Sequence, residues 1–242
     1  MTAAREAAPL YDFACEGADV RLGLAGLDVS LRLSGALWMA AERALVVADL
    51  HLEKGSAYAA RGQLLPPYDT RDTLRRLAAE VQALDPRVLV MLGDAFHDGA
   101  AEDRLAEEDA ASIHALARGR TLVWVVGNHD PLPPLRLPGE TAEALTVAGL
   151  DLRHEPCMST VVGEAAGHLH PCARISAGGR SVRRRCFVTD GERLILPAFG
   201  AYAGGLSIRD AAFTPLFARP PLSVVLGGKR AYPVGFWSVR GD

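Results

Sequence analysis

Three short runs of apolar residues constrain the fold of this chain most. They cover residues 44–48, 87–92 and 121–126, and valine and leucine dominate them. Strands that are apolar at nearly every position are typical of parallel sheets, because both faces of a parallel sheet are covered. The sequence therefore predicts a sheet of parallel strands at the centre of the fold.

Two amphipathic stretches separate these runs. A helix is predicted over residues 69–84 because apolar side chains repeat on one face, and Pro86 follows its end. A second helix is predicted over residues 102–117, with acidic residues in its first turn, where the helix dipole favours them. Residues 53–68 contain two glycines and two prolines and predict a loop or a broken helix. This alternation of strands and helices favours parallel pairing with right-handed crossovers.

The remaining segments predict further strands. Residues 29–33 alternate between apolar and polar, residues 37–40 form another predicted strand, and residues 1–20 are expected to be partly disordered. After Pro138, short alternating segments with glycine turns predict a second, more antiparallel sheet. These segments are residues 146–152, 160–162, 184–188, 193–196, 223–226 and 235–239. We therefore expect an α/β fold in which two mixed sheets pack face to face with helices outside, as a single domain over residues 1–242.

Composition excludes several classes of protein. The chain has 242 residues, of which 49% are hydrophobic, as in ordinary globular domains. The formal net charge of −3 gives no overall positive field, so nucleic-acid binding would require a local basic patch. The four cysteines form no CxxC pair, which argues against a zinc knuckle or a disulfide scaffold. No signal peptide or membrane-spanning run is visible, so the expectation is a cytoplasmic protein that does not bind a membrane.

Polar residues with ligand chemistry follow each of the three apolar runs. The motifs are Asp49-x-His51, Gly93-Asp94 and Gly127-Asn128-His129-Asp130. Ligands of open α/β sheets bind beyond the carboxyl ends of the strands, so these loops are expected to meet. Oxygen and imidazole groups without thiolates suit a divalent ion such as Mn²⁺, Fe²⁺, Zn²⁺ or Mg²⁺.

The second half of the chain adds histidines to this set. His154 stands alone, and a Gly-His-Leu-His motif contains His168 and His170. If His168 and His170 lie on one strand, their side chains point to the same face, because successive side chains alternate. The chain then has enough groups for two metal ions that share one carboxylate. Such ions lie about 3.5–4 Å apart and clamp the attacking and leaving oxygens of a phosphoryl displacement.

The order of these motifs resembles that of a known superfamily. DLH, GDAFHD, GNHD, a lone downstream histidine and GHLH occur in this order in the calcineurin-like metallophosphoesterases. DLHLEKG, GDAFHD and the stretch from RRRCFV to LILPAFGAY further resemble PdeM, the bacterial ligase-associated DNA damage response endonuclease subfamily. The resemblance implies a four-layer αββα sandwich, the metallophosphoesterase fold, and a two-metal phosphodiesterase. At subfamily level it implies a DNA endonuclease, with single strands favoured, that works in DNA repair beside an ATP-dependent DNA ligase, a helicase and an exonuclease.

The resemblance also implies a role for each motif residue. Two metal ions are expected, with Mn²⁺ preferred and Fe²⁺, Zn²⁺ or Mg²⁺ as alternatives. The implied ligands of the first metal are Asp49, His51, Asp94 and His170. Asp94 would bridge to the second metal, whose other implied ligands are Asn128, His154 and His168. The implied catalytic residues are His129 as general acid, Asp130 as the residue that orients it, and His97 as a second active-site histidine. A structural role for His97 stays open.

A cluster of five arginines is the clearest basic feature. It contains Arg174, Arg180, Arg183, Arg184 and Arg185, and no Lys, Asp or Glu interrupts it. One interpretation is a phosphate-backbone contact surface beside the metals, and the other is a solvated hairpin with surface ion pairs. On a regular strand Arg183 and Arg185 share one face and Arg184 lies on the other.

A glycine-rich tract at residues 200–205 follows the next predicted strand. It is either a substrate loop, in which Tyr202 stacks on a base, or a plain turn. The expected substrate contacts are therefore Arg180, Arg183, Arg184, Arg185 and Tyr202.

Two other functions remain open. A phosphatase or nucleotide pyrophosphatase on the same scaffold would keep all the metal motifs. An open groove beside the arginines, rather than a closed pocket, would distinguish an endonuclease from it. A non-catalytic scaffold protein is the other alternative. Intact Asp49, Asp94, Asn128 and His129 argue against it, because such members of the superfamily usually lose ligands.

Overall fold

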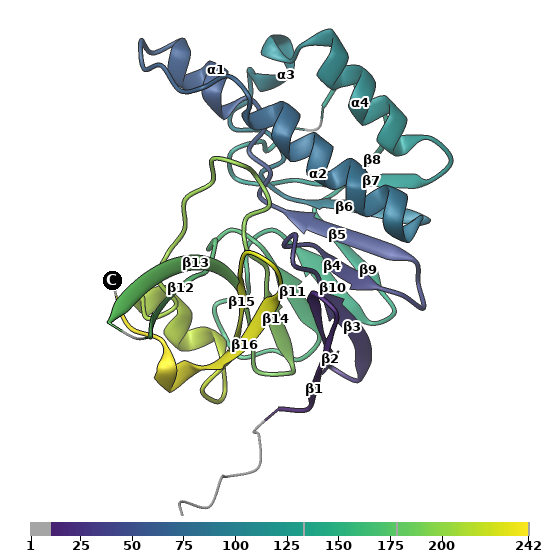
Figure 1. Ribbon diagram of the computed structural model, residues 1–242. Helices are drawn as coiled ribbons and strands as arrows, with labels where there is room; N and C mark the ends of the chain where they lie inside the picture. Colours follow the sequence, from purple (N-terminus) through teal and green to yellow (C-terminus); the bar gives the residue numbers. More distant parts are fainter. Residues whose placement is uncertain (1–10, 133, 178, 242) are drawn as a thin grey trace, which may run out of the picture.

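The first sheet carries the parallel strands at its centre. The computed structural model describes residues 11–132, 134–177 and 179–241 (Figure 1). Within them the first sheet is ordered β1 to β8 along the chain. Its strands are β1 (Phe13–Glu16), β2 (Asp19–Leu24), β3 (Leu27–Leu31), β4 (Leu37–Met39), β5 (Ala44–Ala48), β6 (Val88–Leu92), β7 (Thr121–Val125) and β8 (Glu140–Ala142). The parallel pairing predicted for the three apolar runs is confirmed, because β5 pairs with β6 and β6 with β7 in parallel.

An antiparallel meander extends this sheet toward the N-terminus. β1 to β5 pair antiparallel in sequence order. The hairpin of β1 and β2 spans residues 13–24, so the expectation of partial disorder over residues 1–20 is wrong for residues 13–20. Residues 1–10 lie outside the described part of the chain.

Helices cover the outer face of the first sheet (Figure 1). They are α1 (Lys54–Ala59), α2 (Asp69–Leu84), α3 (Ala101–Arg104) and α4 (Glu107–Ala117). Leu77 of α2 and Ile113 of α4 are fully buried in the cluster between helices and sheet. The helix predicted over residues 102–117 is split, because Leu105 and Ala106 adopt extended backbone between α3 and α4. Among the described helices, none is long and apolar enough to cross a membrane.

The second sheet is built from the C-terminal half of the chain. Its strands are β9 (Ala144–Val147), β10 (Leu150–Arg153), β11 (Glu164–Ala166), β12 (Cys172–Ala177), β13 (Arg180–Thr189), β14 (Arg193–Ile195), β15 (Leu222–Leu226) and β16 (Ala231–Gly235). The order is β16-β15-β13-β14-β11-β10-β9, and β12 pairs with β13. β10 and β14 pair in parallel with β11, so this sheet is also mixed.

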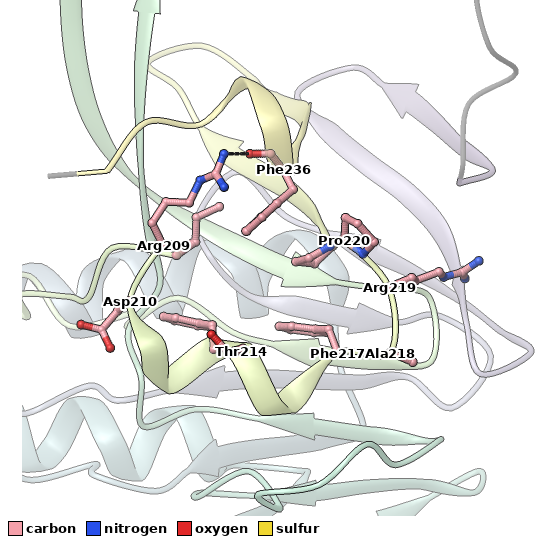
Figure 2. A pocket seen from close by; sticks show the side chains of 11 residues that line it. Arg209, Asp210, Thr214, Phe217, Ala218, Arg219, Pro220 and Phe236 are labelled. Atoms are coloured by element: carbon pink, nitrogen blue, oxygen red, sulfur yellow. Dashed lines mark hydrogen bonds between the residues drawn. The ribbon is translucent and has the colours of Figure 1, made fainter.

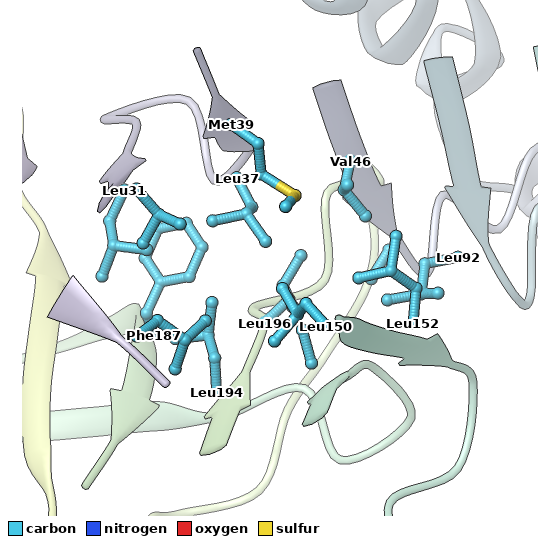
Figure 3. Close-up of a cluster of buried hydrophobic side chains, with 14 of the residues drawn as sticks. Leu31, Leu37, Met39, Val46, Leu92, Leu150, Leu152, Phe187, Leu194 and Leu196 are labelled. Atoms are coloured by element: carbon cyan, nitrogen blue, oxygen red, sulfur yellow. The ribbon is translucent and has the colours of Figure 1, made fainter. Parts of the chain in front are cut away.

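The two sheets pack face to face around the main core. Figure 3 shows Leu37 and Val46 of the first sheet on one side of the core and Phe187 and Leu150 of the second sheet on the other, and all four belong to one buried cluster. Two 3-10 helices, η1 (Ala211–Leu216) and η2 (Phe236–Ser238), follow β14 and β16. Phe213 of η1 packs against Ile195 of β14. The predicted sandwich of two mixed sheets flanked by helices is thus confirmed, with a thin helical layer on the second sheet.

Three predicted strands differ from the structure. Residues 146–152 form the hairpin of β9 and β10, because a two-residue turn with positive φ reverses the chain. Residues 160–162 form a loop in which Val162 is 72% exposed, so their apolar residues do not mark a strand. Most of residues 235–239 belong to η2 and its end, where backbone carbonyls accept hydrogen bonds from the Arg209 guanidinium.

Candidate metal centre and active site

Loops from both sheets meet at one edge of the sandwich. Asp49, Asp94 and Asn128 follow the parallel strands β5, β6 and β7, which therefore bring them to the same edge. His154 follows β10 and His168 follows β11 of the second sheet. The N–H of His168 donates to both carboxylate oxygens of Asp49, at 3.1 and 3.0 Å. The backbone of the second sheet is thus tied directly to a carboxylate of the first.

The four residues implied for the first metal form one cluster. The ligand atoms of Asp49, His51, Asp94 and His170 all lie within 4.8 Å of one another. Nε2 of His170 lies 3.2 Å from Nε2 of His51 and 3.2 Å from Oδ1 of Asp49. Nε2 of His51 lies 3.8 Å from Oδ2 of Asp94. Asp49, His51 and Asp94 are buried, so the cluster lies at the inner end of the site.

The residues implied for the second metal converge beside it. Oδ1 of Asn128 lies 2.9 Å from Nε2 of His154 and 3.0 Å from Nδ1 of His168. Nε2 of His154 also lies 3.4 Å from Oδ1 of Asp94. The two oxygens of Asp94 therefore face different groups: Oδ2 faces His51, and Oδ1 faces His154. This is the arrangement that a bridging carboxylate requires.

The donor set fits divalent cations. Burial, followed by the neighbouring His170 and His129, lowers the pKa of His51 to about 2, so this imidazole is neutral and offers a lone pair. Buried carboxylates need a compensating charge. Within the described residues, the salt-bridge partners of Asp49 and Asp94 are imidazoles. Carboxylate, amide and imidazole donors together suit a hard or borderline divalent ion.

Left-handed backbone brings most of these ligands into place. Asp49, His51, Asp94, His168 and His170 have φ values of 53°, 45°, 45°, 69° and 45°. Such values cost about 1 kcal/mol or more for residues other than glycine and persist where the surrounding structure enforces them. The expectation that His168 and His170 share a strand is wrong, because both lie in a loop after β11. Strain concentrated on ligand residues is typical of a functional site.

Glycines in the motifs allow the loops to approach closely. A Cβ atom on Gly127 would lie 2.2 Å from the backbone nitrogen of Asp94, and one on Gly93 would lie 2.2 Å from Nδ1 of His154. Real Cβ atoms essentially never show contacts this short. Both glycines are therefore required for the two ligand sets to meet.

His129 lies at the exposed rim of the cluster. Its backbone N–H donates to Oδ1 of Asp94 at 2.9 Å, which fixes the residue beside the shared carboxylate. Its Nδ1 lies 3.0 Å from the carbonyl oxygen of His97. Because a carbonyl oxygen only accepts, Nδ1 carries the proton of this bond, and Nε2 is left for other chemistry. The rings of His129 and His97 stack with centroids 5.5 Å apart.

Asp130 holds two loops together. Its carboxylate accepts from the N–H of Gly127 at 3.1 Å and from the N–H of Phe96 at 3.0 Å. Burial is the main cause that raises its pKa to about 6. Nδ1 of His129 is hydrogen-bonded to the His97 carbonyl. This differs from the expectation that Asp130 orients the His129 ring.

The glycine-rich tract, taken with its flanking residues as 198–206, separates the metal cluster from the arginine cluster. On one side, the N–H of Gly200 donates to the carbonyl oxygen of Asp49 at 3.1 Å. On the other, Arg185 donates to the carbonyl oxygens of Ala198, Ala201 and Ala203, at 3.0, 3.1 and 3.2 Å.

Neighbouring residues confirm how the arginines divide between the faces of β13. Arg183 donates to the carbonyl of Gly205, whereas Arg184 is exposed and donates to the carbonyl of Arg183. Arg180 is exposed near the end of the β12–β13 hairpin. The hydroxyl of Tyr202 donates to the carbonyl of Pro66 at 2.9 Å, which anchors the tract to the loop before α2.

Sequence analysis missed Arg76 of α2. Its guanidinium lies 4.7 Å from the centre of the Phe199 ring and donates to the Phe199 carbonyl. No local pattern in the sequence marks this residue, because its partner Phe199 lies 123 residues away.

A separate pocket lies between η1 and η2 (Figure 2). Figure 2 shows its lining, which includes Phe217, Pro220 and Phe236, and its volume is about 310 Å³. The Arg209 guanidinium there lies 4.0 Å from the centre of the Phe236 ring and donates to backbone carbonyls. Among the described residues, those lining this pocket include none of the candidate metal ligands.

Comparison with known proteins agrees with this site. The model of the calcineurin-like phosphoesterase family matches residues 42–171, which contain every candidate ligand. Among solved structures, the nuclease MPE of Pseudomonas putida is 29% identical, and the match covers 92% of this chain and 100% of that chain with a TM-score of 0.68. Yfce, a phosphoesterase from E. coli, is 14% identical over 80% of this chain and 98% of that chain, with a TM-score of 0.38. No curated protein matches the sequence.

The fold and the ligand cluster define a metal-dependent phosphoesterase, a hydrolase. Because the family model covers more than half of the sequence, the chain belongs to the calcineurin-like phosphoesterase family.

Proposed function

We propose that the chain is a Mn²⁺-dependent endonuclease that hydrolyses phosphodiesters of single-stranded DNA during DNA repair in the cytoplasm. The observation that carries this proposal is the exposed His129 imidazole beside two ligand sets that share Asp94. The likeness to a nuclease across 92% of the chain supports it. Resemblance to the ligase-associated endonucleases supports an ATP-dependent DNA ligase, a helicase and an exonuclease as functional partners.

The residues that converge at the sheet edge would hold two divalent ions. The first set is Asp49, His51, Asp94 and His170, and the second is Asp94, Asn128, His154 and His168. When bound, the ions neutralise the charge of the phosphodiester and lower the pKa of the attacking water.

His129 supplies the proton that the leaving group needs. A sugar alkoxide is a poor leaving group, so protonation of its oxygen in the transition state accelerates cleavage by about 10²–10⁴-fold. The bond from Nδ1 to the His97 carbonyl fixes the ring and leaves Nε2 to carry and donate this proton. The His97 ring, stacked on His129, limits the orientations that the imidazole can adopt.

An activity panel tests the proposal. The purified protein, loaded in turn with Mn²⁺, Fe²⁺, Zn²⁺ and Mg²⁺, is assayed on a bis-aryl phosphate, a mono-aryl phosphate, a dinucleotide pyrophosphate, circular single-stranded DNA and double-stranded DNA. We expect Mn²⁺ to support hydrolysis of the bis-aryl phosphate and internal cleavage of circular single-stranded DNA. Hydrolysis of the mono-aryl phosphate alone would instead identify a phosphatase, and cleavage of dinucleotide pyrophosphates alone a nucleotide pyrophosphatase.

The shape of the site favours a polymeric substrate. Asn128 and His129 are both exposed, so the outer side of the cluster is open to solvent. A long chain can pass across such a site, whereas a closed pocket would select small esters. If no metal supports hydrolysis of any of these substrates, the chain is a non-catalytic scaffold.

A further inference from the structure

A cavity lined by arginines lies on the far side of the glycine-rich tract from Asp49. Its volume is about 430 Å³. Arg76 of α2 and Arg183, Arg184 and Arg185 of β13 line it, together with Ser34 and two leucines. Among the described residues that line this arginine pocket there is no carboxylate. Arginines from two segments far apart in the sequence, α2 and β13, thus line one space.

Backbone carbonyls satisfy some of these guanidinium groups without neutralising them. Arg185 donates to three carbonyl oxygens of the tract, and Arg76 donates to the carbonyl of Phe199. A carbonyl oxygen carries no net charge, so both positive charges persist in a half-buried place. Burial is the main cause that lowers the pKa of both side chains. The positive charge of Arg185 lowers the pKa of Arg76 further, and Asp72 acts in the opposite direction. An anion in the arginine pocket would reduce the repulsion between the positive charges of Arg76 and Arg185.

The chemistry of the arginine pocket fits an oxyanion such as a phosphate group. Guanidinium groups present planar pairs of donors that match phosphate oxygens, and arginine is the preferred residue for such contacts. The Gly200 N–H donates to the Asp49 carbonyl on one side of the tract, and the Arg185 guanidinium holds the other side. The arginine pocket and the metal ligands are therefore separated by this single segment of chain.

We propose that the arginine pocket binds a backbone phosphate of the polynucleotide substrate other than the one being cleaved. This inference rests on the proposed function, since it assigns a second contact to the same substrate. Small esters reach the metal ligands alone, whereas a DNA strand that crosses the tract also engages the arginines. The arginine pocket would thus account for preference for polymers over small diesters.

Steady-state cleavage by the full-length, Mn²⁺-loaded protein tests the proposal. The main variant is Arg184→Gln, because Arg184 is exposed and its hydrogen bond is to the neighbouring Arg183 carbonyl. Arg76→Gln probes the helix side. Arg184→Lys and Arg76→Lys keep the charge. Arg75→Gln is the matched control, because Arg75 is exposed beside Arg76 on α2 and pairs with Asp72.

We expect Arg184→Gln to raise the KM for single-stranded DNA about tenfold with kcat retained, as expected when one charge-assisted hydrogen bond is removed. The KM for the bis-aryl phosphate should change far less. The log–log salt dependence of DNA binding should flatten by about 0.7 for each phosphate that the protein no longer neutralises. The lysine variants should recover most of the affinity, and Arg75→Gln should behave as the unaltered protein. Thermal melting verifies that each variant is folded.

Three other results would overturn the proposal, each in a different way. If both glutamine variants keep the KM for DNA and its salt dependence, the arginine pocket does not contact the substrate, although the endonuclease assignment survives. If the unaltered protein hydrolyses the bis-aryl phosphate but not DNA, the proposed function itself fails. If inorganic phosphate binds the unaltered protein, and the glutamine variants lose this binding without any change in the KM for DNA, the arginine pocket is a site for free phosphate.

Discussion

The side chain of His129 is held by the main chain of His97: its Nδ1 lies 3.0 Å from the His97 carbonyl oxygen. A loop of the first sheet after β6 thereby orients the imidazole on the loop after β7. The backbone carbonyl is present whatever the side chain of residue 97. A mutation of His97 can therefore remove its ring and keep the hydrogen bond to His129.

Replacing His129→Ala should retain both metal ions and lower cleavage of DNA by about 10²–10⁴-fold, because the leaving alkoxide loses its proton donor. A bis-aryl phosphate, whose leaving group needs less protonation, should be affected less. Elemental analysis and kinetics on both substrates check this, with exposed His114→Ala as control. Equal losses on alkyl and aryl leaving groups would argue for a purely electrostatic imidazole.

The variant His97→Ala tests the role of the His97 ring separately from that of its backbone carbonyl. The hydrogen bond to His129 remains, but the stacked ring is removed. We expect kcat on DNA to fall about tenfold, less than the loss of about 10²–10⁴-fold expected for the proton donor itself. Full activity in this variant would show that His97 acts through its backbone alone.

Asp94→Asn should release the second metal ion and abolish activity, because this carboxylate faces both ligand sets. The measurement is metal stoichiometry after gel filtration, compared with Asp151→Asn, whose carboxylate is exposed on β10. Two ions per chain in the Asp94 variant would refute the bridging assignment.

Gly127→Ala should lower the free energy of unfolding by about 3 kcal/mol, as overpacking in a rigid site does. The added Cβ would lie 2.2 Å from both the backbone nitrogen and a carboxylate oxygen of Asp94, so metal affinity should fall as well. Gly228→Ala is the control, because no atom lies within 4 Å of its Cβ position. Chemical denaturation measures the free energy of unfolding of both variants, and Mn²⁺ titration measures their metal affinity.

Arg185→Ala should cost about 2 kcal/mol of stability, because three carbonyls of the tract lose their donors. Arg184→Ala should leave the melting temperature nearly unchanged, since its side chain is exposed. A similar melting temperature for both variants would contradict a clamping role for Arg185.

The sequence predicts the parallel strands and the ligand motifs because both depend on local pattern. Apolar runs identify β5 to β7. Asp94 follows the end of β6 in the sequence, so its place at the sheet edge does not depend on how the rest of the chain folds. The left-handed backbone at His168 and His170 has no local sequence signal, because packing against the other sheet enforces it. The role of Arg76 could not be predicted for the same reason, because its partner Phe199 lies 123 residues away.

The division of ligands between two sheets gives the metal ions a mechanical role. Asp49 and Asp94 lie in loops that follow strands of the first sheet, and His154 and His168 lie in loops that follow strands of the second. Bound ions would therefore cross-link the two sheets at one end of the sandwich, whereas the apolar core joins them in the middle. After chelation the buried carboxylates repel one another, so amide exchange should accelerate at this end and stay slow around Phe187. Metal supply in the cell would then govern how long the enzyme resists proteolysis, as well as how fast it turns over.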